Sequence, residues 1–176
     1  MTAEAATIRP ATPADLPDIQ RIYAHHVLTG LASFEETPPD LVEMTRRFSG
    51  LVEAGFPYLA AELGGRVVGY AYCGPYRPRP AYRYSVENSV YLAHDAAGRG
   101  LGRRLLEALI ERATAIGKRQ MVAVIGDSAN HASIGLHETL GFRRVGTIEG
   151  AGFKHGRWVD SVLMQRALGP GLATPP

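Results

Sequence analysis

Residues 89–106 form the segment that most constrains how this chain folds. They read Ser-Val-Tyr-Leu-Ala-His-Asp-Ala-Ala-Gly-Arg-Gly-Leu-Gly-Arg-Arg-Leu-Leu, which predicts a strand, a glycine-spaced turn and a helix that opens at Gly102. The first N–H groups of a helix have no partner inside it and attract anions. Glycines let the main chain approach a bulky group, because they carry no Cβ. With Arg99, Arg103 and Arg104 alongside, the segment is typical of a pyrophosphate-binding turn.

Three kinds of cofactor site use such a turn. A nucleoside-triphosphate loop needs a Lys-Ser or Lys-Thr pair after its last glycine, and the chain has neither. A dinucleotide site needs G-x-G-x-x-G and a carboxylate on the next strand. Here Gly98, Gly100 and Gly102 read G-x-G-x-G, and the predicted strand at 120–125 has no carboxylate. The third kind, a coenzyme A site, is compatible with the spacing, although an ordinary turn with a helix cap explains the same glycines.

Composition limits the remaining function classes. The 176 residues, 45% hydrophobic and 20% charged, predict a single globular domain. A net charge of +2 without a basic-aromatic stretch argues against nucleic-acid binding. We find no apolar run of membrane-spanning length and no signal peptide. The lone Cys73 has no disulfide partner and no metal-ligand neighbours, so we expect a buried thiol, no metal and a cytoplasmic location.

Hydrophobic periodicity predicts a mixed α/β sheet in one layer, with helices on both faces. A domain is expected over 1–168, followed by a flexible tail at 169–176 that is rich in glycine and proline. Helices are predicted from Thr12 onward and over 39–54, 102–115 and 130–140, and strands around Ile8 and over 58–63, 67–73, 84–92, 120–125, 143–148 and 157–165.

Glu87 lies within the strand that leads into the glycine turn. On a strand, Ser85, Glu87, Ser89 and Tyr91 share one face. A carboxylate in such a sheet is costly to bury unless it is paired or used. An ion pair with a nearby arginine explains it, and so does a general base that removes a proton from an ammonium group before the amine attacks.

The helix predicted over 130–140 carries the second candidate group. Asn130, Ser133, Ile134 and His137 are spaced to lie along one helical face, where they could contact a pantetheine arm and its thiol. A histidine titrates near neutral pH and can protonate a departing thiolate or bind substrate. A histidine at the surface or the core edge, without any such partner, fits the pattern equally.

The third candidate group is a proline-interrupted loop at 74–83, which projects Arg77, Arg79 and Arg83. Arginine forks suit carboxylate or phosphinate oxygens, although a solvated basic loop is the simpler interpretation. Phe34 lies in the loop between the first two helices, where it could line a pocket or only pack the loop.

Taken together, these segments resemble the phosphinothricin and methionine-sulfoximine N-acetyltransferases of the GNAT superfamily, over about residues 8–168. The turn fits the end of that superfamily's R/Q-x-x-G-x-G/A signature, although Ala97 replaces the usual Arg or Gln. The other segments that carry the resemblance are 86–92, 122–126, 136–142, 151–158 and 163–166.

The resemblance implies a single domain with a mostly antiparallel sheet and direct acetyl transfer from acetyl-CoA to the α-amine of a small amino acid or analogue, such as phosphinothricin, methionine sulfoximine or methionine sulfone. It matches the family's base to Glu87 and its helix histidine to His137. It also implies a homodimer. The implied acetyl-CoA contacts are Val90, Tyr91, Leu92, Gly98, Arg99, Gly100, Leu101, Gly102, Arg103 and Asn130, and the implied substrate contacts are Phe34, Arg77, Arg79, Glu87, Asn88 and Ser89.

One departure bears on the substrate. Members that inactivate phosphinothricin carry a basic residue directly after the aromatic, whereas this chain has Glu35, and an acid there does not favour a dianionic substrate. Acetylation of another amine, such as a peptide or protein N-terminus, is therefore an alternative, and so is a CoA-binding module without catalysis. Polyamines fit less well, because the loop arginines would repel them.

Overall fold

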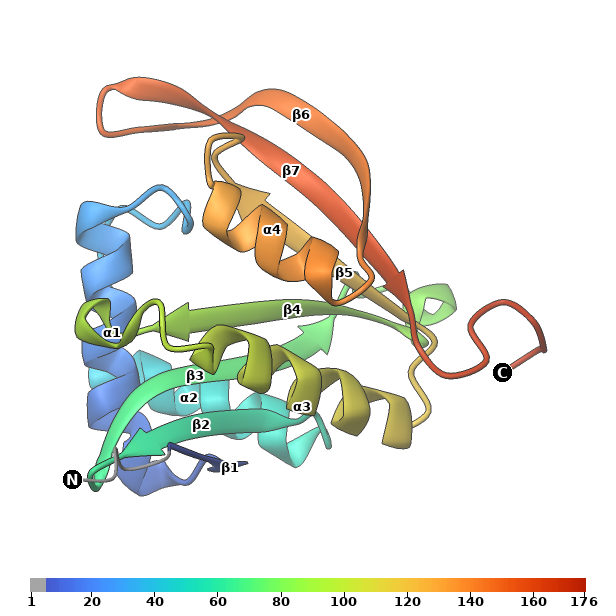
Figure 1. Ribbon diagram of the computed structural model, residues 1–176, viewed down its shortest axis with the longest axis horizontal. Helices are drawn as coiled ribbons and strands as arrows, with labels where there is room; N and C mark the ends of the chain where they lie inside the picture. The colour runs from blue at the N-terminus through green and yellow to red at the C-terminus, as the bar shows by residue number, and fades with distance from the viewer. Residues whose placement is uncertain (1–5) are drawn as a thin grey trace.

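The computed structural model describes residues 6–176 as one seven-stranded sheet. Residues 1–5, where the sequence predicts no signal peptide, lie outside the described residues. The strand order is β1-β2-β3-β4-β5-β7-β6, and every neighbouring pair is antiparallel except β4 and β5 (Figure 1). The strands are β1 (Thr7–Pro10), β2 (Tyr58–Leu63), β3 (Arg66–Pro75), β4 (Ser85–Leu92), β5 (Gln120–Gly126), β6 (Arg143–Lys154) and β7 (Arg157–Ala167).

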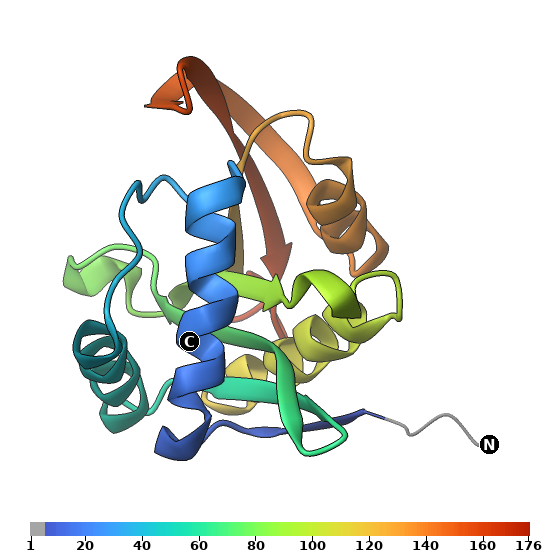
Figure 2. The ribbon, with the colours of Figure 1, turned by 90° about the vertical axis from the view of Figure 1, so that its left-hand side faces the viewer.

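Four helices cover both faces of the sheet. Figure 2 shows α1 and α2 on one side and α3 and α4 on the other. The predicted fold class, a mixed and mostly antiparallel sheet between helices, is therefore confirmed. The helices are α1 (Leu16–Thr29), α2 (Leu41–Glu53), α3 (Leu101–Ala115) and α4 (His131–Thr139).

Local signals explain where several elements begin. The Asp40 side chain accepts a hydrogen bond from the Glu43 amide, which caps α2, and Asn130 caps α4 in the same way through the Ser133 amide. Gly64 and Gly65 form the tight turn between β2 and β3, both with positive φ.

The predicted end of β6 near residue 148 is wrong, because the strand continues to Lys154. Its pairing with β7 shifts register twice, between Arg144 and Gly146 and between Ile148 and Gly152. Such bulges bend a strand without ending it. They interrupt the regular alternation from which strands are predicted, so the sequence pattern stops before the strand does.

The core lies on both faces of the sheet, under the two helix layers. Leu105 and Leu109 of α3 are fully buried on one face, and Ile19 of α1 and Phe48 of α2 are buried on the other. Among residues 6–176, no helix combines the length and the apolar character that crossing a membrane requires.

At the C-terminus, the Arg119 guanidinium donates to the carbonyls of Gly171 (3.3 Å) and Pro175 (3.0 Å). The division into a domain at 1–168 and a flexible tail at 169–176 stays a prediction.

Candidate active site

A gap in the sheet forms the centre of the candidate site. The parallel pairing of β4 with β5 stops at Asn88 and Ala123, yet both strands continue. Ala93 donates to Val68 on β3. Because peptide groups alternate sides along a strand, the amides of Val90 and Leu92 point away from β3 into the gap. The amide of Tyr91, also a predicted cofactor contact, points to β3 instead.

The glycine turn lies where β4 leaves the sheet and leads into α3. Gly98 and Gly100 have φ of 75° and 73°, and a Cβ at either would meet only open space. This left-handed backbone is costly for other residues. No side chain caps the start of α3, and its first turn contains no acidic residue. The amides of Leu101, Gly102 and Arg103 are therefore available to an anion.

A cavity of about 560 Å³ joins the gap to this turn. Its lining includes Val90 and Leu92 of β4, Gly98 and Gly102 of the turn, and Asn130 before α4. This cavity fits a long ligand with a pyrophosphate and an amide-containing arm. The open space at the glycines and the uncapped start of α3 suit the pyrophosphate, and the strand amides in the gap suit the arm. These residues therefore fit coenzyme A.

The arginines near the turn have different surroundings. Arg103 is ion-paired with Glu107 at 2.9 Å, and Arg104 donates to the carbonyl of Ala6. Arg99 is exposed. Of the three, Arg104 is bound to the Ala6 carbonyl, whereas Arg99 and Arg103 stay the predicted pyrophosphate contacts.

Glu87 lies on the sheet face that α1 and α2 cover. It pairs with Gly74 on β3, and a Cβ on Gly74 would come within 2.9 Å of Leu51 on α2. Burial raises the pKa of Glu87, and the charge of Arg77 opposes that rise. A half-buried carboxylate with a raised pKa is a better proton acceptor than a free one.

His137 lies on the opposite face and contacts β4 through Asn88. The His137 ring is 3% exposed, with Nδ1 2.8 Å from the Ser133 carbonyl and Nε2 3.1 Å from Asn88 Oδ1. The Asn88 amide nitrogen donates to the Val122 carbonyl on β5 (3.3 Å), where the two strands separate. Asn88, a predicted substrate contact, thus turns its side chain toward His137, away from the face of Glu87.

The hydrogen-bond partners of His137 and its burial favour different protonation states. Both ring nitrogens face carbonyl oxygens, so only the imidazolium can donate to both. Burial acts in the other direction and lowers the pKa of His137. These two tendencies oppose each other, and the role of His137 as a proton carrier stays a prediction.

The loop between β3 and β4 brings Arg77 near Glu87, as its effect on the pKa of that residue indicates. The Arg77 guanidinium lies over the Tyr76 ring (5.2 Å), and that of Arg83 lies over the Tyr84 ring (4.7 Å). Arg79 is exposed, at the start of the short 3₁₀ turn Pro80–Tyr82.

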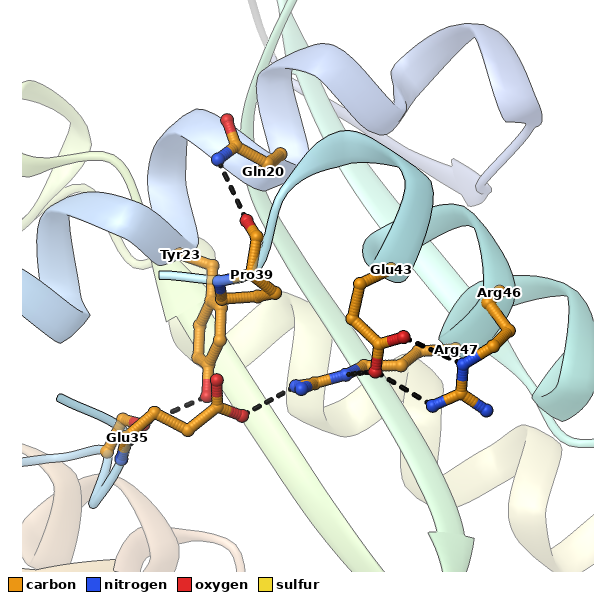
Figure 3. A network of polar contacts seen from close by, with 8 residues as sticks. Gln20, Tyr23, Glu35, Pro39, Glu43, Arg46 and Arg47 are labelled. Atoms are coloured by element: carbon orange, nitrogen blue, oxygen red, sulfur yellow. Dashed lines mark hydrogen bonds and ion pairs between the residues drawn. The ribbon is translucent and has the colours of Figure 1, made fainter. Parts of the chain in front are cut away.

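Phe34 and Glu35 lie in the loop between α1 and α2. A Cβ on Gly152 of β6 would come within 2.9 Å of the Phe34 ring, so this glycine makes room for the aromatic side chain. Glu35 forms an ion pair with Arg47 of α2 at 2.5 Å (Figure 3). The charge of Glu35, which the sequence suggests is unfavourable to an anionic substrate, is therefore balanced.

Sequence reasoning missed two residues that position this site. His26 Nε2 donates to the Leu92 carbonyl at 2.8 Å, and the same ring lines the 560 Å³ cavity. Lys154, 1% exposed, donates to the Ser33 carbonyl at 2.7 Å and so ties the hairpin of β6 and β7 to the Phe34 loop. Neither contact has a local sequence signal, because each joins segments far apart in the chain.

Among the described residues, no cluster of three or more His, Cys, Asp or Glu side chains has a metal-binding arrangement. Cys73 is fully buried, and burial raises its thiol pKa to about 12.

Comparison with known proteins identifies relatives along nearly the whole chain. Residues 8–163 match the family described as acetyltransferase (GNAT) domain. The chain is 54% identical to a phosphinothricin N-acetyltransferase of Alcaligenes faecalis over 98% of its own length and 87% of the relative. It is 46% identical to an L-methionine sulfoximine/L-methionine sulfone acetyltransferase of Pseudomonas paraeruginosa, over 97% of this chain and 99% of that one.

The solved structures that resemble this chain are also acetyltransferases. A GNAT phosphinothricin acetyltransferase of Sinorhizobium meliloti, in complex with acetyl-CoA, superposes with a TM-score of 0.95 and 50% identity, covering 97% of this chain and 92% of that one. A putative acetyltransferase of Salmonella typhimurium with acetyl-CoA superposes with a TM-score of 0.93 and 40% identity, covering 98% of both chains.

Proposed function

This chain belongs to the GNAT acetyltransferase family and is an N-acetyltransferase with acetyl-CoA as its co-substrate, and we propose that it acetylates the α-amine of a small amino acid or analogue by direct transfer. The names of its relatives support substrates of the phosphinothricin, methionine sulfoximine and methionine sulfone type. The observation that carries the proposal is the gap between β4 and β5, which opens just beyond Asn88, the residue after Glu87.

The gap and the glycine turn are proposed to hold acetyl-CoA. The amides of Val90 and Leu92 would receive the carbonyl groups of its pantetheine arm, and the amides at the start of α3 would receive its pyrophosphate. The bound co-substrate supplies an activated acetyl group as a thioester. Holding it along β4 would bring that group beside the strand positions of Glu87 and Asn88.

Glu87 is proposed to act as the general base. An α-ammonium has no lone pair, so it must lose a proton before the nitrogen can attack a carbonyl carbon. The raised pKa of Glu87 and its position on the side of α1 and α2 support this role.

His137 is proposed to return a proton to the departing thiolate. Its buried ring reaches β4 through Asn88 from the other face of the sheet. The amine and the thiol would thus use proton carriers on opposite faces of the gap. This separation prevents the base from directly neutralising the acid.

Arg77 and Arg79 are proposed to bind the carboxylate of the substrate, with Ser89 near its amine and Phe34 packed against the substrate. A guanidinium matches a carboxylate with two parallel hydrogen bonds. We also propose a cytoplasmic location, supported by the single buried thiol, and a homodimer, supported by the exposed Phe153 and Trp158 rings of the β6–β7 hairpin (57% and 71% exposed).

Thiol release from acetyl-CoA tests the base directly. With L-methionine sulfoximine, L-methionine sulfone and L-phosphinothricin as substrates, Glu87→Gln should lower kcat by about 10²–10⁴ while the affinity for acetyl-CoA stays near that of the wild type. Glu53→Gln, at the exposed end of α2, is the matched control. Unimpaired turnover by Glu87→Gln would refute the base.

The arginine role has its own test. Arg79→Ala should raise KM for these amino acids about tenfold, because one carboxylate partner is lost, and should not change KM for a small amine without a carboxylate. An equal effect on both substrates would show that Arg79 acts other than by binding the carboxylate.

A further inference from the structure

A second cavity, of about 320 Å³, lies between α2 and the sheet, on the face that carries Glu87. None of the predicted substrate or cofactor contacts lines it. We call it the tyrosine cavity, because four of its wall residues are tyrosines. Apart from Gly50 and two arginines at the rim, its lining consists of Tyr23, Met44, Leu51, Tyr58, Tyr70 and Tyr72.

The tyrosine cavity adjoins the proposed base. Tyr72 is directly opposite Ser89 in the register of β3 and β4, and Glu87 is two residues along on the same face. Leu51, another wall residue, lies over Gly74, which is opposite Glu87. A substrate whose amine is at Glu87 therefore has this cavity within the reach of its side chain.

The walls combine apolar rings with tyrosine hydroxyl groups, and two of these, on Tyr58 and Tyr70, are free to bind a ligand. Tyr58 lies parallel to Tyr72 and Tyr70, with ring centroids 4.9 and 6.0 Å away. Tyr70 is 1% exposed and Tyr58 6%, and neither hydroxyl forms a hydrogen bond within residues 6–176. Burial raises the pKa of both, so they remain donors at neutral pH. Both residues line the cavity, and neither hydroxyl is a buried polar atom without a partner among residues 6–176, so each can donate to a ligand in the cavity that brings acceptors.

The rim of the cavity is electrically balanced. Arg47 is ion-paired with Glu35 at 2.5 Å and with Glu43 at 2.7 Å, and Glu43 also pairs with Arg46 at 2.7 Å (Figure 3). Two cations and two anions leave no net charge at the entrance. An anion that entered would lose its hydration without meeting an uncompensated cation.

We propose, on the basis of the proposed function, that the tyrosine cavity receives the side chain of the amino-acid substrate. Its occupant is an uncharged side chain with an apolar stem and a hydrogen-bond-accepting end, as in a sulfone, in preference to an anionic phosphinate. Glu35 determines this specificity, because it neutralises the guanidinium that an anionic side chain would need.

The charge argument is tested with two substrates that share the reacting amine and carboxylate. L-Methionine sulfone has a neutral side chain and L-phosphinothricin an anionic one. In Glu35→Gln, Arg47 keeps only the carboxylate that it shares with Arg46. The kcat/KM ratio of phosphinothricin to methionine sulfone should therefore rise about tenfold, whereas Glu53→Gln should leave it unchanged. An unchanged or lower ratio in Glu35→Gln would overturn the assignment.

The second test removes one hydroxyl from the cavity floor without changing its shape. Tyr70→Phe should raise KM for methionine sulfone about three- to tenfold with kcat within twofold. The control is Tyr84→Phe, since Tyr84 lies outside the cavity. Titration calorimetry with methionine sulfone, on enzyme saturated with CoA, should show the same loss of affinity without turnover.

The two proposals fail in different ways. If the wild type acetylates none of the amino acids, the proposed function is wrong. Calorimetry then still tests whether the tyrosine cavity binds the side chain of methionine sulfone. A weaker affinity for methionine sulfone in Tyr70→Phe supports this binding, and an affinity that is absent or unchanged in Tyr70→Phe overturns it.

Discussion

Gly126, at the end of β5, passes so close to the loop after α1 that an alanine would not fit. A Cβ there would lie 3.2 Å from both the Cα and the carbonyl carbon of Ala32, and closer still to the Leu31 carbonyl oxygen. These are main-chain atoms, so no side-chain rotation can relieve the overlap and the loop must move.

The expected cost of Gly126→Ala follows from this overlap. Overpacking of this kind destabilises a protein by about 1–3 kcal/mol. In a chain of this size each kcal/mol lowers Tm by about 2–4 °C, so Tm should fall by roughly 2–12 °C. Because Leu31, Ala32 and Gly126 also line the 560 Å³ cavity, KM for acetyl-CoA should rise as well.

Thermal unfolding followed by circular dichroism, together with steady-state kinetics, measures both effects. Gly135→Ala is the matched control: Gly135 lies within α4, and its Cβ would meet nothing within 4 Å. That variant should gain up to about 1 kcal/mol from helix propensity. If Gly126→Ala were as stable as the wild type, the close approach of the loop to β5 would be refuted.

Two predictions concern pH. Because burial raises the pKa of Glu87 and Arg77 opposes that rise, kcat/KM should fall as pH drops through the raised pKa. Arg77→Ala should move this limb to higher pH, and a profile that moved to lower pH would contradict the assignment. Hydrogen bonds from Arg9 lower the pKa of the buried Asp15 to about 2, from a usual 3.8. The stability from this pair should be complete at pH 7 and lost as pH falls from about 4 to 2. Urea denaturation should show Asp15→Asn about 1–3 kcal/mol less stable at pH 7, with the difference vanishing near pH 2.

The glycine turn was predictable because its signals are local. A left-handed φ at Gly98 and Gly100, and a helix start without a capping side chain, depend on the residues at those positions themselves. The strand before the turn was predicted from its own alternation. The turn that we propose binds the cofactor could therefore be identified from one segment of sequence.

The relation between the proposed base and acid was not predictable in the same way. Glu87 and His137 were both singled out, but only the tertiary structure shows that they lie on opposite faces of the sheet. A shift of register by one residue would exchange the faces of β4. The sequence around either residue does not contain that information.

The sequence by itself thus determined the fold class, the approximate position of the helices and strands, and the glycine turn that we propose binds acetyl-CoA, because backbone preferences and hydrophobic periodicity act over a few residues. Only the tertiary structure decided how Glu35 and Arg47 neutralise each other, how His26 meets Leu92, and how tyrosines from α1, β2 and β3 enclose one cavity. These contacts join residues 12 to 66 positions apart, and they exist only once the strands have paired and the helices have packed on the sheet.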